Sequence, residues 1–158
     1  MRFNGEREVP GPVGRVADAL HDREVLRAII PGCEELVPID AGLYAASLAA
    51  RVGPVADVYR GTFSVEDVGP GAVIRVRVAA RGRCGRLDVD LSVTLSPGSR
   101  AGTSALRYDA DATVRGLVSR LGTATLTVAG NHFTGGFFRQ LERSLRGDVT
   151  GRREASLV

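Results

Sequence analysis

Between residues 35 and 114, apolar and polar side chains alternate along a series of short segments. Groups of glycine, proline and small polar residues separate the segments at residues 40–42, 53–54, 69–71, 81–83 and 96–99. Alternation with a period of two is typical of strands that bury one face, and the glycine and proline groups are typical of turns. The pattern predicts an antiparallel meander of about six strands.

The same alternation assigns side chains to the two faces of the predicted sheet, because successive residues of a strand point in opposite directions. The outward set is charged: Arg75, Arg77, Asp88, Asp90, Arg107 and Asp109. The inward set is apolar or aromatic: Ile74, Val76, Leu87, Val89, Leu106 and Tyr108. One face of the sheet is therefore predicted to be continuously apolar.

A first strand and two short helices are predicted ahead of the meander. Residues 2–9 alternate like a strand, and prolines and a glycine at residues 10–12 end it. Apolar residues then recur at helical spacing over residues 13–20. Asp22 is a suitable N-cap for a second helix, which must end at Pro31 because proline disfavours a helical residue before it.

The periodicity changes after residue 114 to that of a long helix ending near Gly147. Its predicted inward face is Leu117, Leu121, Ala124, Val128, Phe133, Phe137 and Leu141. Glycines at 130, 135 and 136 each cost a helix about 1 kcal/mol relative to alanine. The pattern thus predicts a helix that depends on packing against the sheet for its stability.

These elements predict a single α+β domain over residues 1–146, in which a bent antiparallel sheet of six to seven strands wraps around the long helix. Residues 147–158 are polar and are predicted to form a mobile tail. The N-terminus does not resemble a secretory signal, and no apolar run reaches the roughly 20 residues that span a bilayer. We therefore expect a cytoplasmic location.

The composition excludes some chemistry. All 21 basic residues are arginine, so Schiff-base catalysis by lysine is excluded. Cys33 and Cys84 lie far apart, outside any zinc or redox motif, and we predict neither a metal site nor a cofactor. The net charge of +3 permits contact with anionic partners without requiring it.

Several short motifs occur in an order found in one known family. They are Asp22–Leu26, Ile30–Leu36, Val52–Val55, Tyr59–Thr62, Leu106–Ala112, Leu121–Gly122 and Phe137–Phe138. In these residues the chain resembles the carbon monoxide dehydrogenase G-subunit (CoxG) family of the START-like (SRPBCC) helix-grip superfamily. The resemblance covers residues 1–146. It departs from the family around Val16, where an aromatic residue is usual, and in the short polar tail.

The resemblance implies a helix-grip fold and a non-catalytic carrier of a hydrophobic small molecule such as a quinone. It also implies association with a molybdenum hydroxylase of carbon monoxide dehydrogenase type, in maturation, membrane recruitment or electron-acceptor supply. The side chains expected to line the ligand are Tyr44, Leu48, Tyr59, Phe63, Ile74, Val76, Val78, Leu87, Val89, Leu91, Leu106, Tyr108, Ala110, Leu121, Val128, His132, Phe133 and Phe137. From the residues alone, a filled core remains an alternative to a cavity.

Two other functions remain open. Relatives with this fold include polyketide cyclases and dehydratases, so an enzyme acting in the same cavity is one alternative, and a ligand-free protein adaptor is another. His21 is expected to cap a helix end, whereas His132 is a candidate hydrogen-bonding partner for a ligand. The outward carboxylates are better explained by ion pairs than by catalysis, and we predict no catalytic residue.

Arginines gather around one predicted hairpin, at Arg75, Arg77, Arg81, Arg83 and Arg86. They either form a solvated edge that prevents aggregation or contact lipid phosphates or an acidic partner. Contact with lipid would place the protein peripherally at the inner face of the membrane. No aromatic residues are interleaved with the arginines, so nucleic acid is not an expected partner.

Overall fold

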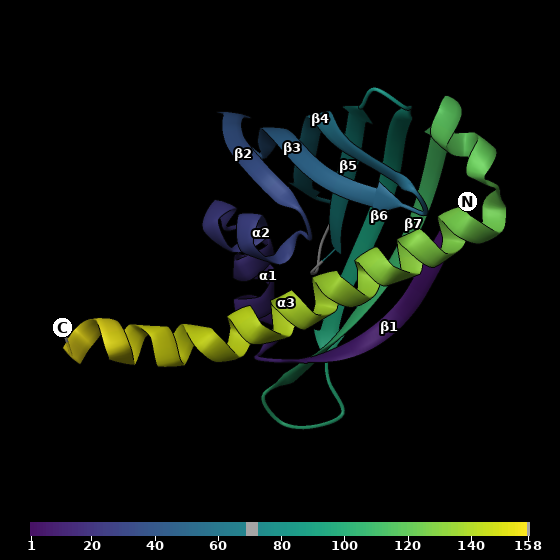
Figure 1. Cartoon of the computed structure of the whole chain (residues 1–158). Coiled ribbons are helices and arrows are strands. Elements are labelled where there is room, and N and C mark those ends of the chain that lie inside the picture. Colours follow the sequence, from purple (N-terminus) through teal and green to yellow (C-terminus); the bar gives the residue numbers. More distant parts are fainter. Residues whose placement is uncertain (69–72, 158) are drawn as a thin grey trace.

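The computed structural model describes residues 1–68 and 73–157, with side chains described as far as Gly147 (Figure 1). The elements are β1 (Arg2–Pro10), α1 (Val13–His21), α2 (Arg23–Ile29), β2 (Cys33–Asp40), β3 (Leu43–Val52), β4 (Val55–Asp67), β5 (Val73–Arg81), β6 (Arg86–Pro97), β7 (Thr103–Arg115), the 3₁₀ helix η1 (Leu117–Leu121) and α3 (Thr123–Leu157). The predicted order of strand, two short helices, meander and long helix is confirmed.

The strands form one antiparallel sheet in the order β1-β7-β6-β5-β4-β3-β2. The sheet curves, and α3 crosses its concave side, while α1 and α2 lie at one end (Figure 1). The fold class is therefore α+β, with seven strands. Within the part of the chain that the structure describes, no helix is long and apolar enough to cross a membrane.

Gly61 lets β4 and β5 approach each other closely within the curved sheet. A Cβ atom at this position would collide with the carbonyl oxygen of Ala79 on β5. Gly61 lies opposite Ala80 in the register of the two strands. A residue without a side chain is thus needed where the two backbones come together.

The two short helices meet at Asp22, as predicted. Its carboxylate accepts hydrogen bonds from the backbone N–H groups of Glu24 and Val25, which caps the start of α2. From α2, Arg23 and Arg27 donate to the backbone carbonyls of Leu36 and Glu34. These carbonyls belong to β2, the last strand of the sheet, so α2 covers part of an edge that is otherwise free to pair.

The tightly packed core lies at the α1 and α2 end of the concave side. Its largest fully buried side chains are Val9, Val16, Ile29, Leu36, Ile74, Leu106, Phe138 and Leu141. They come from the sheet and from α1, α2 and α3. Burial of these side chains, from α1, α2 and α3 against the sheet, is the main source of stability at this end.

The C-terminal region differs from the prediction at both ends of the helix. Residues 117–121 form the separate helix η1, which lies between Gly116 and Gly122, both with a φ of 89°. Leu117, predicted to face inward, is 60% exposed. The α3 backbone continues to Leu157, whereas residues 147–158 were predicted to be a tail. The domain boundary at residue 146 stays a prediction.

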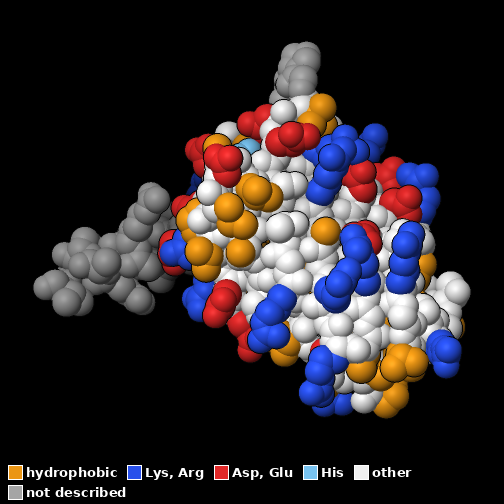
Figure 2. All heavy atoms as spheres, turned by 90° about the horizontal axis from the view of Figure 1, so that it is seen from above, with side chains coloured by type: hydrophobic (Ala, Val, Ile, Leu, Met, Phe, Trp, Pro, Cys, Tyr) orange, Lys and Arg blue, Asp and Glu red, His pale blue; other side chains and the backbone are white. Residues whose placement is uncertain are grey.

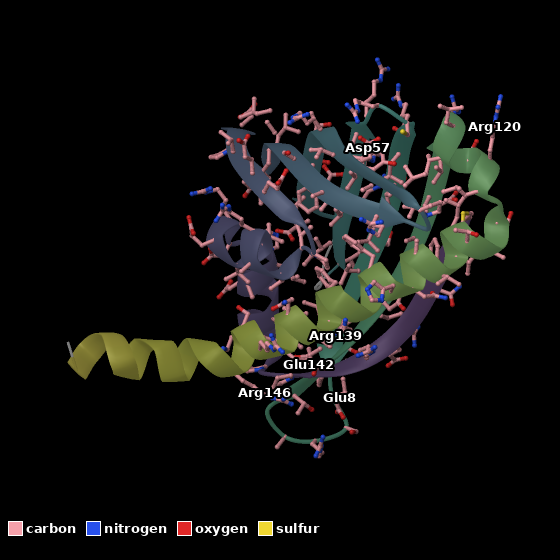
Figure 3. The ribbon with its side chains drawn as sticks, in the orientation of Figure 1. Glu8, Asp57, Arg120, Arg139, Glu142 and Arg146 are labelled. Carbon is pink, nitrogen blue, oxygen red and sulfur yellow. The ribbon has the colours of Figure 1, made fainter. Side chains whose placement is uncertain are left out.

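Glu8 ties β1 to the turn between β6 and β7, at the opposite end of the molecule from Asp57 (Figure 3). Its carboxylate accepts hydrogen bonds from the hydroxyls of Ser99 and Thr103 and from the N–H groups of Ser99 and Arg100. These bonds, the Ser99 hydroxyl first, lower the pKa of Glu8 from 4.5 to about 2.

A pH-dependent loss of stability follows from this lowered pKa. Because the folded-state pKa lies below the unfolded one, the contribution of Glu8 is complete above pH 4.5 and falls as the pH drops towards 2. We expect Glu8→Gln to weaken the dependence of the melting temperature on pH in that window. Glu6→Gln is the control for the loss of one acidic group, and equal pH profiles for the two variants would contradict the assignment.

Candidate functional site

The strand register gathers the predicted strand residues on the concave face. Phe63 on β4 lies opposite Tyr44 on β3 and Val78 on β5. Val78 in turn lies opposite Val89 on β6. The residues placed on this face by the register are Tyr44, Leu48, Tyr59, Phe63, Ile74, Val76, Val78, Leu87, Val89, Leu91, Leu106, Tyr108 and Ala110. The predicted division of the sheet into an apolar and a charged face is confirmed.

Helix α3 packs on this face along β1 and β7. The ring of Phe138 lies 5.5 Å from the ring of Tyr108, measured between centroids, and the guanidinium of Arg7 stands 4.9 Å from the centre of the Phe138 ring. A Cβ atom on Gly130 would collide with the ring of Phe3 on β1. The absence of a side chain at Gly130 therefore brings the helix close to this side of the sheet.

The helix also touches the other side of the sheet. A Cβ atom on Gly136 would lie 3.2 Å from Cγ of Pro31, in the turn before β2. At about 3.6 residues per turn, Phe133 lies midway around the helix between Gly130 and Gly136. Because both flanking positions touch the protein, Phe133 faces the sheet between them. Its side chain is only partly covered there, with 39% of it exposed.

The concave face has two distinct parts. At the α1 and α2 end, side chains such as Ile74 and Leu106 are at most 2% exposed. Towards the β5–β6 turn and η1, the inward residues are only half-buried: Leu48, Phe63, Val76, Val78, Leu87, Val89, Leu91 and Ala110. The apolar side chains of the concave face are thus tightly packed at one end and partly exposed at the other.

Tyr59 and Asp57 supply polar groups beside these half-buried residues. Tyr59 is 6% exposed, and burial, with a smaller effect from Asp57, raises the pKa of its hydroxyl. Asp57 accepts hydrogen bonds from the N–H groups of Cys84, Val58 and Arg83, which lower the pKa of its carboxyl. Asp57 therefore holds the β5–β6 turn in place.

Burial raises the pKa of the Cys33 thiol, which disfavours its reactive thiolate form.

Two residues predicted to line the ligand lie elsewhere. Val128 is 68% exposed, and His132, four residues on, is exposed beside it on the outer side of α3. The prediction counted one continuous apolar ridge from Leu117 through Leu121. The break at Gly122 shifts the phase of the helix, so residues beyond it do not continue that ridge. Leu121 belongs to η1 and is half-buried.

The sequence interpretation omitted Phe3, Arg7 and Leu126. Phe3 and Arg7 share the concave face with Tyr108, since they lie opposite Ala110 and Leu106 in the pairing of β1 with β7. The alternation along residues 2–9 contained this signal. Leu126 is half-buried on α3, about one turn before Gly130, and is found only when the phase of the helix is known.

The charged residues of the convex face form ion pairs. Arg75 pairs with Asp90 at 2.7 Å, which confirms the predicted explanation for these carboxylates. His21 contacts the carbonyl of Ala17 at 2.6 Å and the carboxylate of Asp67 at 3.0 Å, close to the end of α1. Among the described residues, no group of three His, Cys, Asp or Glu side chains is placed to hold a metal ion.

A curved antiparallel sheet gripped by a long C-terminal helix, with an apolar concave face, defines a START-like helix-grip protein. The model of the carbon monoxide dehydrogenase G-subunit (CoxG) family matches residues 5–146, and the chain belongs to this family. This confirms the resemblance noted in the sequence. A search of curated proteins gave no match.

Solved structures share the fold across nearly the whole chain. A conserved protein from Geobacillus kaustophilus is 25% identical, with a TM-score of 0.86 over 92% of this chain and 95% of that one. The Zhui aromatase/cyclase from Streptomyces sp. R1128 is 13% identical, with a TM-score of 0.71 over 94% and 95%. A START superfamily protein from Mycobacterium smegmatis is 11% identical, with a TM-score of 0.69 over 92% and 97%.

Proposed function

We propose that the protein carries a hydrophobic small molecule, a quinone or a similar lipid, in the hollow between α3 and the sheet. It does so without catalysis and presents the molecule to a molybdenum hydroxylase of carbon monoxide dehydrogenase type. The family name supports this class of partner. The residues proposed to contact the ligand are the half-buried inward residues of the sheet, together with Tyr59, Leu121, Phe133 and Phe137.

The half-buried apolar surface near the β5–β6 turn is the observation that carries this proposal. Val78 on β5 is a neighbour of Val89 and Leu91 on β6, and all three side chains remain partly exposed to solvent. An unfilled hollow is costly, at about 24 cal/mol per Å³ in measured core truncations. An apolar ligand that fills the space relieves this cost, and few polar groups are needed to orient it.

The chemistry of the concave face supports a carrier over an enzyme. Its described hydroxyl groups include those of Tyr44, Tyr59 and Tyr108, while His21 and His132 both lie outside it. The carboxylate of Asp57 is occupied by three backbone N–H groups. The aromatase/cyclase relatives keep an enzyme as the second candidate, although their identity to this chain of 13% shows the fold alone.

Extraction of the protein from its native host, followed by mass spectrometry, tests the carrier function. We expect a quinone or another isoprenoid lipid in near-stoichiometric amount. Titration of the extracted protein with a soluble quinone analogue should then show saturable binding. An empty extract and no saturable binding would contradict the carrier and favour the adaptor, whereas turnover of an added polyketide would favour the enzyme.

A further inference from the structure

Four arginines form a continuous row across the convex face of the sheet. Arg81 on β5 lies directly opposite Arg60 on β4 and Arg86 on β6. Arg86 lies directly opposite Arg115 on β7. Neighbouring strands are about 4.7–4.9 Å apart, so the four side chains start at strand spacing from one another. We name Arg60, Arg81, Arg86 and Arg115 the arginine row.

The arginine row contrasts with the rest of the convex face. Three outward arginines elsewhere meet carboxylates: Arg75 with Asp90 at 2.7 Å, Arg2 with Asp109 at 2.8 Å and Arg107 with Glu6 at 3.4 Å. Among described residues of the row, only Arg86 has such a partner, Asp88 at 2.9 Å. Like charges directly opposite on adjacent strands destabilise a sheet. The row therefore maintains a concentration of positive charge that folding alone does not favour.

Further cations and one apolar side chain extend this surface. At the β4 end of the row, an open groove of about 580 Å³ is lined in part by Arg51, Arg60 and Arg83. At the β7 end, η1 carries Leu117, which is 60% exposed, and Arg120. The N–H of Val118 donates to the carbonyl of Cys84 at 2.8 Å, which fixes η1 against the β5–β6 turn.

The figures show how this end of the molecule is arranged. Arg120 projects from η1 at the same end as Asp57, which lies by the β5–β6 turn (Figure 3). Figure 2 looks onto this end and shows arginine side chains distributed over a broad surface rather than around a single point. Such a surface matches an extended array of anions better than one small anion.

We propose that the arginine row docks the protein on a membrane surface rich in anionic phospholipid. The guanidinium groups pair with lipid phosphates, and Leu117 enters the headgroup layer between Arg115 and Arg120. An exposed leucine among arginines suits an anionic lipid surface, where the arginines meet phosphates and the leucine meets the apolar layer directly below them. The proposal goes beyond the carrier function and requires no ligand in the hollow.

Sedimentation with vesicles tests this docking surface. Full-length, lipid-extracted protein is mixed with vesicles of phosphatidylcholine alone or of phosphatidylcholine with phosphatidylglycerol. We expect binding only to the anionic vesicles, decreasing as salt rises. The double variant Arg60→Gln/Arg81→Gln should bind roughly thirtyfold more weakly, since each arginine near an anionic surface contributes about 1 kcal/mol.

The double variant Arg75→Gln/Arg107→Gln is the matched control, because it removes the same charge from paired arginines of the same face. It should bind the anionic vesicles nearly as well as the unmodified protein. Equal weakening in both variants would reduce the effect to net charge and overturn the proposal, as would failure of the unmodified protein to bind. Binding to an acidic protein but not to vesicles would overturn it in favour of a protein partner.

Thermal melting at low salt checks that the variants fold and tests the row by itself. We expect Arg60→Gln/Arg81→Gln to melt at a higher temperature than the unmodified protein, because it removes opposed like charges. The control variant should melt at the same temperature or lower, because it loses two ion pairs. A lower melting temperature for the row variant would mean that the row is stabilised within the fold, and this would count against a docking role.

Discussion

Replacing Phe138 by alanine is expected to destabilise the protein by about 3–5 kcal/mol, a large part of the stability of a domain of this size. Phe138 is 2% exposed, and its ring lies 5.5 Å from the rings of both Tyr108 and Phe137. It joins α3 to β7 and also carries the guanidinium of Arg7 on its face. The substitution removes all of these contacts and leaves a cavity at the tightly packed end.

Urea denaturation measures this loss, and Val128→Ala provides the matched control on the same helix. Val128 is 68% exposed, so its truncation should change the free energy of unfolding by less than about 0.5 kcal/mol. A small effect of Phe138→Ala, similar to that of Val128→Ala, would mean that α3 is not held on the sheet through this ring. The packing described for the helix would then be wrong.

Replacing Val89 by phenylalanine is expected to weaken ligand binding by tenfold or more while leaving the fold intact. Val89 is half-buried at the centre of the concave face, opposite Val78 and Ala112. A larger side chain there occupies space that we assign to the ligand. In a closed core the same change would instead cost about 1–3 kcal/mol of stability through overpacking.

Titration with a soluble quinone analogue and urea denaturation of the same samples separate these outcomes. Ser92→Phe adds a similar ring to the exposed face of the same strand and should leave affinity unchanged. Weaker binding with unchanged stability supports the hollow. Lower stability of Val89→Phe, together with unchanged affinity, would show that Val89 packs in a closed core and that the ligand, if any, binds elsewhere.

The sheet could be predicted from the sequence because its signal is local. Alternation along each strand assigned Val76, Val89 and Tyr108 to one face without knowledge of their partners. The cap at Asp22 could be predicted equally well, because its carboxylate accepts from an N–H group only two residues further along the chain. These predictions needed only the period of the pattern and the chemistry of single residues.

The orientation of α3 could not be predicted in the same way. The prediction of one helix face on both sides of Gly122 assumed an unbroken helix. The φ of 89° at that glycine is not helical and interrupts the helix. Consequently Val128 and His132 were predicted to face inward, although both lie on the outer side of the helix. Phe133 was also predicted to face inward, and it does face the sheet. Glycines that looked like weak points of the helix, Gly130 and Gly136, are instead the positions where it meets Phe3 and Pro31.

The arginine row was also beyond the reach of local pattern. The sequence drew attention to Arg75 and Arg77, which are neighbours along one strand, and to the turn that follows. Arg60 and Arg115 are far from this turn in the sequence and join Arg81 and Arg86 only through the register of four strands. A concentration of charge across a sheet depends on strand pairing, which a single strand does not specify.

The two glycine contacts of α3 have a consequence for the size of the cargo. Gly130 sets the height of the helix above β1, and Gly136 sets it above the turn at Pro31. Because neither residue has a side chain, α3 packs close to β1 and to the turn at Pro31, and the space between the helix and the sheet stays narrow. In a homologue with alanine or serine at both positions, either Phe3 and Pro31 shift or the helix moves away from the sheet. If the helix moves, the space below it accepts a bulkier molecule, so these two residues limit the width of the ligand without contacting it.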